Sequence, residues 1–195
     1  QKEYTKGDPL KVVLEKGVHK IVGGSRNVLD ITCSHITFLG KGKDQTTIHG
    51  GFKVKNQQHI RFEELTISNQ SYKGFGFSFG GSETNVDVMK CVVKECVDTG
   101  MFVTGGATFT ATQCEFTENA VNGMVCRGAN TKARFHDCTV HHNELDGLVA
   151  YDGAVVDLHG TKTDIYSNTR HAIWAALNAK VNIHLPSQHN TTHDN

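Results

Sequence analysis

Histidine recurs at a nearly constant spacing in the second half of the chain. His136, His159 and His184 are 23 and 25 residues apart, and a charged residue, Arg134 or Asp157, stands two positions before the first two of them. Imidazole and carboxylate groups can act as base and acid toward a sugar acid, and together they can bind a transition metal. We therefore take Arg134, His136, Asp157 and His159 as candidate catalytic residues and His184 as a candidate ligand-binding residue.

A second polar group recurs with the same period. Its first three members are Glu115, Thr139 and Asp164. The residues two positions after them, in the same order, are Thr117, His141 and Tyr166. Sugar-binding grooves use an aromatic ring to stack on the sugar and polar groups to fix its hydroxyls. His141, Asp164 and Tyr166 are therefore candidate ligand-binding residues.

Two other aromatic residues are candidates for stacking on a sugar. Tyr151 and Trp174 both lie in strand-like runs. Trp174, within the run AIWAAL, is predicted instead to be a core residue of the last repeat.

Both polar groups also have a simpler interpretation. Outward polar side chains on a parallel strand are solvated, and like side chains commonly stack from one strand to the next. A straight column of histidines is poorly suited to a tetrahedral metal site, whose ligands must converge on one point. We therefore expect no metal ion and no cofactor.

The elements that position these residues are short strands in a repeat. Cys91, Cys114 and Cys138 are 23 and 24 residues apart, and each opens a similar segment: CVVKECVDTGMFV, CEFTENAVNGMVC and CTVHHNELDGLVA. A period of this length, with residues alternating as they do in strands rather than in helices, indicates a solenoid of β coils. Each coil contains three alternating runs, such as VDVM, CVVK and GMFV.

The predicted fold is an all-β, right-handed, single-stranded parallel β-helix of about seven coils with three short strands per coil. It forms one domain over residues 1–195. Residues 1–9 are expected to be an N-terminal cap or tail, and residues 185–195 a polar C-terminal end, truncated from a longer chain. An uncapped solenoid exposes strand edges, so end-to-end self-association is also expected.

Two further columns of residues follow from the same register. Cys91, Cys114, Cys138 and Cys126 point inward, and stacked strands about 4.8 Å apart hold Cβ atoms farther apart than the roughly 3.8 Å of a disulfide. We expect buried free thiols there, whereas the exposure of Cys96 and Cys33 stays open. The second column is formed by Asn119, Asn143 and Asn168, which can satisfy the backbone groups of stacked turns. It is followed by Gly100, Gly123 and Gly147, which fit positions of positive φ or close packing.

Composition excludes some classes of function. The 20 Lys and Arg residues balance the 20 Asp and Glu residues without clustering, so we expect no nucleic-acid partner. No apolar run approaches the length of about 20 residues that a membrane span needs. The compartment is not determined by the sequence, although an extracellular or virion-surface location is favoured.

The opening coils carry a family resemblance. The stretches LDITCSHITFLGKGKDQTTIHG and FKVKNQQHIRFEELTISN resemble the first coils of the pectate-lyase-like right-handed β-helix superfamily. The resemblance implies this fold and a set of activities that includes polysaccharide lyases, pectin esterases, mannuronan epimerases, phage tailspikes and non-catalytic binding domains. The Asp-Pro-His-Asp run of the epimerases and the Gly-His-Gly of the polygalacturonases are not found in this sequence.

These observations favour a non-catalytic β-helix that presents a flat polar face to a polysaccharide or to a protein surface. The alternative is a polysaccharide-active enzyme, a uronate polymer lyase or epimerase. An enzyme needs a cleft with walls, and only the segment from Asn69 to Glu83 is long and aromatic enough to form one.

Overall fold

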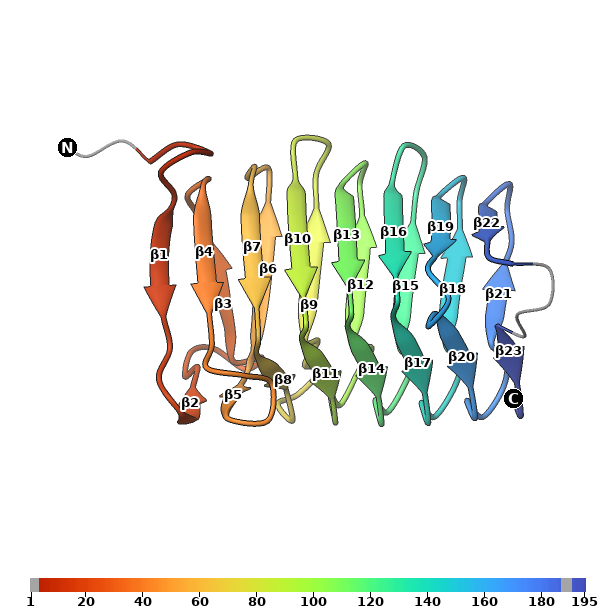
Figure 1. Ribbon diagram of the computed structural model, residues 1–195, viewed down its shortest axis with the longest axis horizontal. Coiled ribbons are helices and arrows are strands. Elements are labelled where there is room, and N and C mark those ends of the chain that lie inside the picture. The colour runs from red at the N-terminus through yellow and green to blue at the C-terminus, as the bar shows by residue number, and fades with distance from the viewer. Residues whose placement is uncertain (1–3, 187–190) are drawn as a thin grey trace.

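Every regular element that the structure describes is a β-strand. The computed structural model describes residues 4–186 and 191–195, and its strands form three parallel sheets that run the length of the molecule (Figure 1). The A sheet consists of β1 (Leu10–Val13), β4 (Ile36–Leu39), β7 (Ile60–Glu63), β10 (Asn85–Met89), β13 (Thr108–Thr112), β16 (Lys132–His136), β19 (Val155–His159) and β22 (Lys180–His184).

The B sheet consists of β2 (Gly17–Lys20), β5 (Thr46–His49), β8 (Thr66–Ser68), β11 (Val92–Lys94), β14 (Glu115–Thr117), β17 (Thr139–His141), β20 (Asp164–Tyr166) and β23 (Thr192–His193). The C sheet consists of β3 (Val28–Ile31), β6 (Gly51–Lys55), β9 (Phe77–Gly80), β12 (Met101–Thr104), β15 (Met124–Arg127), β18 (Leu148–Tyr151) and β21 (Ile173–Ala175).

The chain visits the three sheets in turn, so each strand pairs with its counterpart one coil later. This confirms the predicted parallel β-helix with three strands per coil. The prediction of about seven coils is close, since the A and B sheets each have eight described strands and the C sheet has seven. The polar C-terminal end also joins the stack, because β23 pairs with β20.

The core fills the space between the sheets with alternating inward side chains. A chain of phenylalanine rings runs along it, with Phe62 and Phe77 4.8 Å apart between centroids and Phe79 and Phe109 5.7 Å apart. The segment from Asn69 to Glu83, which the sequence marks as long enough to wall a cleft, does so in part, because Asn69, Gln70 and Ser71 line a cleft of the structure. Two of its four aromatic rings, Phe77 and Phe79, are instead fully buried. They occupy alternate positions of strand β9 and both point inward.

The cysteines are free thiols, as the strand spacing predicts. Cys91, Cys114, Cys126 and Cys138 are buried, Cys96 is buried as well, and Cys33 is exposed. Burial raises the pKa of Cys91, Cys96 and Cys126 to about 12. These thiols therefore stay protonated and serve as small apolar core residues.

The asparagine column is confirmed, and it extends beyond the predicted residues. Asn119 donates through Nδ2 to Oδ1 of Asn143 at 2.9 Å, Asn143 donates to Asn168 at 2.8 Å, and Asn168 donates to Asn195 at 3.0 Å. The residue directly before each asparagine of this ladder has a positive φ, for example Glu118 at 55°. The amides therefore stabilise a turn whose backbone conformation costs free energy by itself.

The glycines after these turns are required for close packing and not for positive φ. A Cβ atom on Gly123 would lie 2.7 Å from the carbonyl oxygen of Gly147 and 2.9 Å from Nδ2 of Asn143. Any side chain there would push neighbouring coils apart.

The first and last coils expose apolar side chains. Val22 is 86% exposed at one end of the stack and Leu177 is 66% exposed at the other. Trp174, predicted to be a core residue, is 41% exposed, because its position on β21 continues the outward column of Val149. End-to-end association stays a prediction.

We predict that Asn143→Ala lowers the free energy of unfolding by about 2–4 kcal/mol, because it leaves the Asn119 amide and the Phe116 carbonyl buried without their partner. Urea unfolding measures this loss. Thr108→Ala, at an exposed position of β13, is the control and should change stability by less than about 0.5 kcal/mol. Equal losses in both variants would contradict the role of the ladder.

Candidate functional site

The A face carries the predicted histidine column, and its register is confirmed. His136 pairs with His159 and His159 with His184 on neighbouring strands, while Arg134 pairs with Asp157. The rings of His159 and His184 are stacked, with centroids 4.4 Å apart and planes 3° apart. His136 instead lies beside Asp137, with its Nδ1 atom 3.2 Å from Oδ2.

Asp157 lies among polar partners on the A face. Its Oδ1 accepts a hydrogen bond from Nδ2 of Asn182 at 2.9 Å and lies 3.3 Å from Nε2 of His184. The hydrogen bond from Asn182 lowers the pKa of the carboxyl group. The structure thus brings Asp157, His159 and His184 together, and separates His136 from them by its pairing with Asp137.

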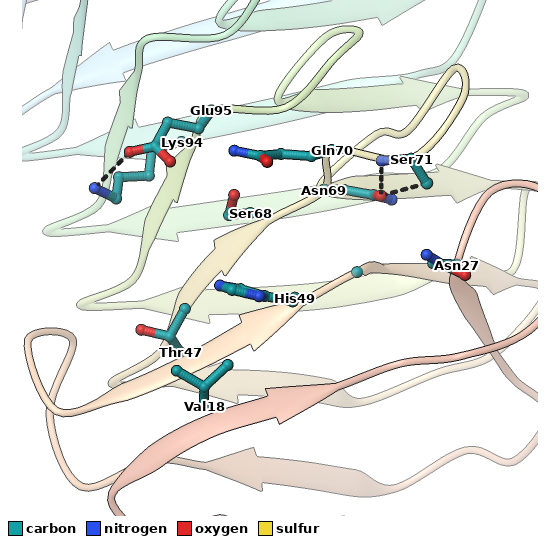
Figure 2. Close-up of a pocket in the computed structure, with 11 residues that line it drawn as sticks. Val18, Asn27, Thr47, His49, Ser68, Asn69, Gln70, Ser71, Lys94 and Glu95 are labelled. Carbon is teal, nitrogen blue, oxygen red and sulfur yellow. Dashed lines mark hydrogen bonds and ion pairs between the residues drawn. The ribbon is translucent and has the colours of Figure 1, made fainter.

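The B face is hollowed along its length. Two clefts, of about 500 Å³ and 250 Å³, share Lys94 in their lining and lie over strands β2, β5, β8, β11, β14 and β17. Figure 2 shows His49, Ser68 and Lys94 on three successive strands along the first cleft. Neither cleft includes the candidate residues of the A face.

One column of side chains follows this hollow from coil to coil, and we call it the B-face column. Its members share one register position on successive B strands: Lys20, His49, Ser68, Lys94, Thr117, His141, Tyr166 and His193. The sequence pattern found Thr117, His141 and Tyr166. It missed the other members because their side chains differ in type and alternation alone does not mark them as a column.

The wall of the second cleft is the loop between β4 and β5, which Figure 1 shows in front of β8. The carbonyl oxygen of Lys43 accepts a hydrogen bond from Oγ1 of Thr66 at 2.6 Å. The Nζ atom of Lys43 lies 3.5 Å from Oε2 of Glu115, three coils farther along. Sequence reasoning missed this residue, although residues 40–45 are an insertion where the next coil has only residues 64 and 65.

His141 lies at one end of this second cleft and has a carboxylate partner. Its Nε2 is 3.1 Å from Oε1 of Glu115, and its Nδ1 is 3.1 Å from Oγ1 of Thr117. Burial lowers the pKa of His141. The imidazole is therefore neutral near pH 7 and can accept or share a proton.

Tyr166 stands between two imidazoles on the same face. Its ring is stacked with His141 at 4.8 Å and with His193 at 5.1 Å between centroids. Both faces of the Tyr166 ring are thus covered by neighbouring rings, so only the edge of this ring could contact a ligand. Asp164 lies beside them, with Oδ2 3.2 Å from Nε2 of His193.

On the C face the outward column changes from polar to apolar along the molecule. It begins with Asp30, Lys53 and Ser78. Phe102, Val125, Val149 and Trp174 follow one another on successive strands. Tyr151 lies beside Trp174, with ring centroids 6.2 Å apart. The two aromatic candidates are therefore brought together, but away from the B-face column.

Comparison with known proteins was made by sequence and by structure. The family model described as "Right handed beta helix region" matches residues 21–192. The chain belongs to this right-handed β-helix family. A sequence search of curated proteins finds no match, and among the described residues no helix is long and apolar enough to cross a bilayer.

Comparison with solved structures gives matches of low sequence identity. The Agl-KA catalytic domain is 14% identical with a TM-score of 0.49, and the match covers 92% of this chain and 48% of that one. The A-module of the Azotobacter vinelandii mannuronan C-5 epimerase AlgE4 is 12% identical with a TM-score of 0.41, covering 97% and 92%. This β-helix chain thus spans about half the length of the Agl-KA domain.

We predict that His141 makes stability depend on pH. Because burial lowers its pKa in the folded β-helix, the unfolded chain takes up the proton more readily, and stability falls as the pH drops below the ordinary value of about 6.5. Urea unfolding midpoints between about pH 7.5 and pH 5.5 should therefore fall less steeply for His141→Gln than for the wild type. His136→Gln, on the A face, is the control, and an equal change of slope in both variants would contradict the assignment.

Proposed function

We propose that this chain is a carbohydrate-binding β-helix whose B-face hollow holds an extended oligosaccharide. The observation that carries the proposal is the B-face column, which places a polar side chain at the same position in every coil along two adjoining clefts. A column of polar groups spaced one coil apart suits an extended polymer, because each coil adds a further group that can contact the ligand.

The chemistry of the hollow favours a sugar over a protein partner. Hydroxyl, imidazole, ammonium and carboxylate groups line it, and Val18 and Val92 are its apolar side chains. Protein interfaces depend on buried aromatic or arginine anchors, whereas sugar hydroxyls are fixed by polar groups that both donate and accept hydrogen bonds. His49 and Gln70, both exposed along the first cleft, supply such groups.

The dimensions of the hollow suit an extended ligand. From β5 to β17 there are four steps between neighbouring strands, or about 19 Å at roughly 4.8 Å per step. The Lys43 loop closes one side, and its ion pair with Glu115 holds it across the coils. A chain of several sugar rings fits along this direction with its hydroxyl groups against the column.

We predict that the protein binds at least one of oligogalacturonate, oligomannuronate and cello-oligosaccharides in isothermal titration calorimetry. His49→Ala and Lys94→Ala remove side chains from the floor of the hollow and should weaken binding by about 10-fold or more, the effect of losing one or two hydrogen bonds to charged groups.

His136→Ala, on the A face, is the matched control and should bind like the wild type. The proposal fails if none of the three oligosaccharides binds, or if the B-face variants bind as tightly as the control.

A second candidate function is a polysaccharide-active enzyme, such as a uronate polymer lyase or epimerase. It is favoured by the pair formed by Glu115 and His141, with Tyr166 stacked on the imidazole. A neutral imidazole held by a carboxylate next to a phenol can move a proton, as such reactions require. The candidate catalytic residues Arg134, His136, Asp157 and His159 lie on the other polar face and stay predictions.

For the enzyme, incubation with alginate or pectin should produce an unsaturated uronate that absorbs in the ultraviolet, or a change in uronate configuration seen by NMR. His141→Gln should then lower the rate by about 100-fold or more, the usual contribution of a general base. If neither measurement detects a change in the polymer, the enzyme hypothesis fails and carbohydrate binding remains the proposed function.

A further inference from the structure

We propose that Asp157, His159 and His184 form a binding site for a divalent transition-metal ion such as Zn²⁺ on the A face, separate from the B-face hollow. One ligand atom from each of the three side chains can be chosen so that all lie within 4.8 Å of one another. Two imidazoles and one carboxylate form a ligand set that binds such ions, whereas Ca²⁺ and Mg²⁺ prefer oxygen ligands alone.

The three residues form a triangle and not a line. Asp157 and His159 are two positions apart on β19 and point to the same side, and His184 lies beside His159 on β22. The sequence-based expectation of no metal rested on a straight column of histidines. The carboxylate, displaced along the strand, removes that objection because the three ligand groups no longer lie on one line.

One edge of the triangle already has the separation that a metal requires. Ligands about 2.1 Å from a tetrahedral ion are about 3.4 Å apart from each other. The Oδ1 atom of Asp157 and Nε2 of His184 are 3.3 Å apart. An ion can therefore replace the hydrogen between these two atoms with little movement of either side chain.

The third ligand comes from His159, and here one rotation is needed. The two imidazole planes are parallel within 3°, so their in-plane lone pairs do not meet at one point. His184 has 51% of its side chain exposed and is free to turn. The Nε2 atom of His159 is buried and has no hydrogen-bond partner among the described residues, which a metal bond would supply.

One neighbouring side chain would support a metal ion in the triangle, and another would oppose it. Asn182 fixes the carboxylate of Asp157 through its 2.9 Å hydrogen bond, a support of the kind that orients metal ligands. The guanidinium of Arg134 opposes a cation, but Arg134 is exposed and can turn into solvent.

The test uses the full chain titrated with Zn²⁺ by isothermal titration calorimetry and with Co²⁺ by visible absorption, which reports the coordination geometry of the bound ion. We expect one site in the wild type, with affinity reduced more than about 10-fold in each of His159→Ala, His184→Ala and Asp157→Asn. These side chains lie on the surface, and circular dichroism checks that each variant is folded.

His136→Ala and His141→Ala are the controls, since these histidines lie outside the triangle, and both should keep wild-type affinity. Absence of binding by the wild type would overturn the proposal. So would wild-type affinity in folded His159→Ala, or a loss in His136→Ala as large as in His159→Ala. Oligosaccharide binding in the B-face hollow should be the same in all A-face variants, so the two proposals stand or fall separately.

Discussion

The hydrogen bonds between parallel strands of successive coils are the interaction on which the whole structure depends. They hold neighbouring strands about 4.8 Å apart and leave each residue beside its equivalent in the next coil. Each side chain therefore lies next to the equivalent side chain of the neighbouring coil, which either has the same type or differs from it. The buried asparagine ladder is the clearest consequence, since each amide satisfies groups of the coil that follows.

The same stacking gives the three faces different chemistry although they share one backbone plan. The A face collects ionisable side chains that pair between coils, as Asp157 does with Asn182 and His184. The B face is hollowed from β2 to β17, and the wall of its second cleft comes from the Lys43 loop. The outward column of the C face is polar on β3, β6 and β9 and apolar from β12 to β21, where Trp174 is exposed. The three faces would therefore bind different partners: a metal ion on the A face, a polymer on the B face and an apolar surface on the apolar part of the C face.

The columns could be predicted from the sequence, whereas the side-chain partners within them could not. Period-two alternation and a coil of 23 to 25 residues place His136, His159 and His184 in one column, and the register confirms it. The turning of His136 toward Asp137 depends on rotamers and local charge, which periodicity does not encode. Trp174 was mistaken for a core residue because a short apolar run does not show which side faces inward.

Loops could be predicted only in part. The sequence marks the segment from Asn69 to Glu83 as able to form a wall, and its first residues do line the larger cleft, whereas strand β9 takes two of its rings into the core. The wall of the second cleft, at Lys43, comes from a polar insertion with no aromatic residue, and only the comparison of connection lengths between coils would have revealed it.

The central claim is that a saccharide lies along the B-face column, and backbone NMR of the isotope-labelled chain tests it most directly. During titration with the oligosaccharide that binds in calorimetry, the claim predicts that shift changes concentrate on β5, β8, β11, β14 and β17 and on the Lys43 loop. Shift changes confined to the A or C face, or none at saturating ligand, would contradict it.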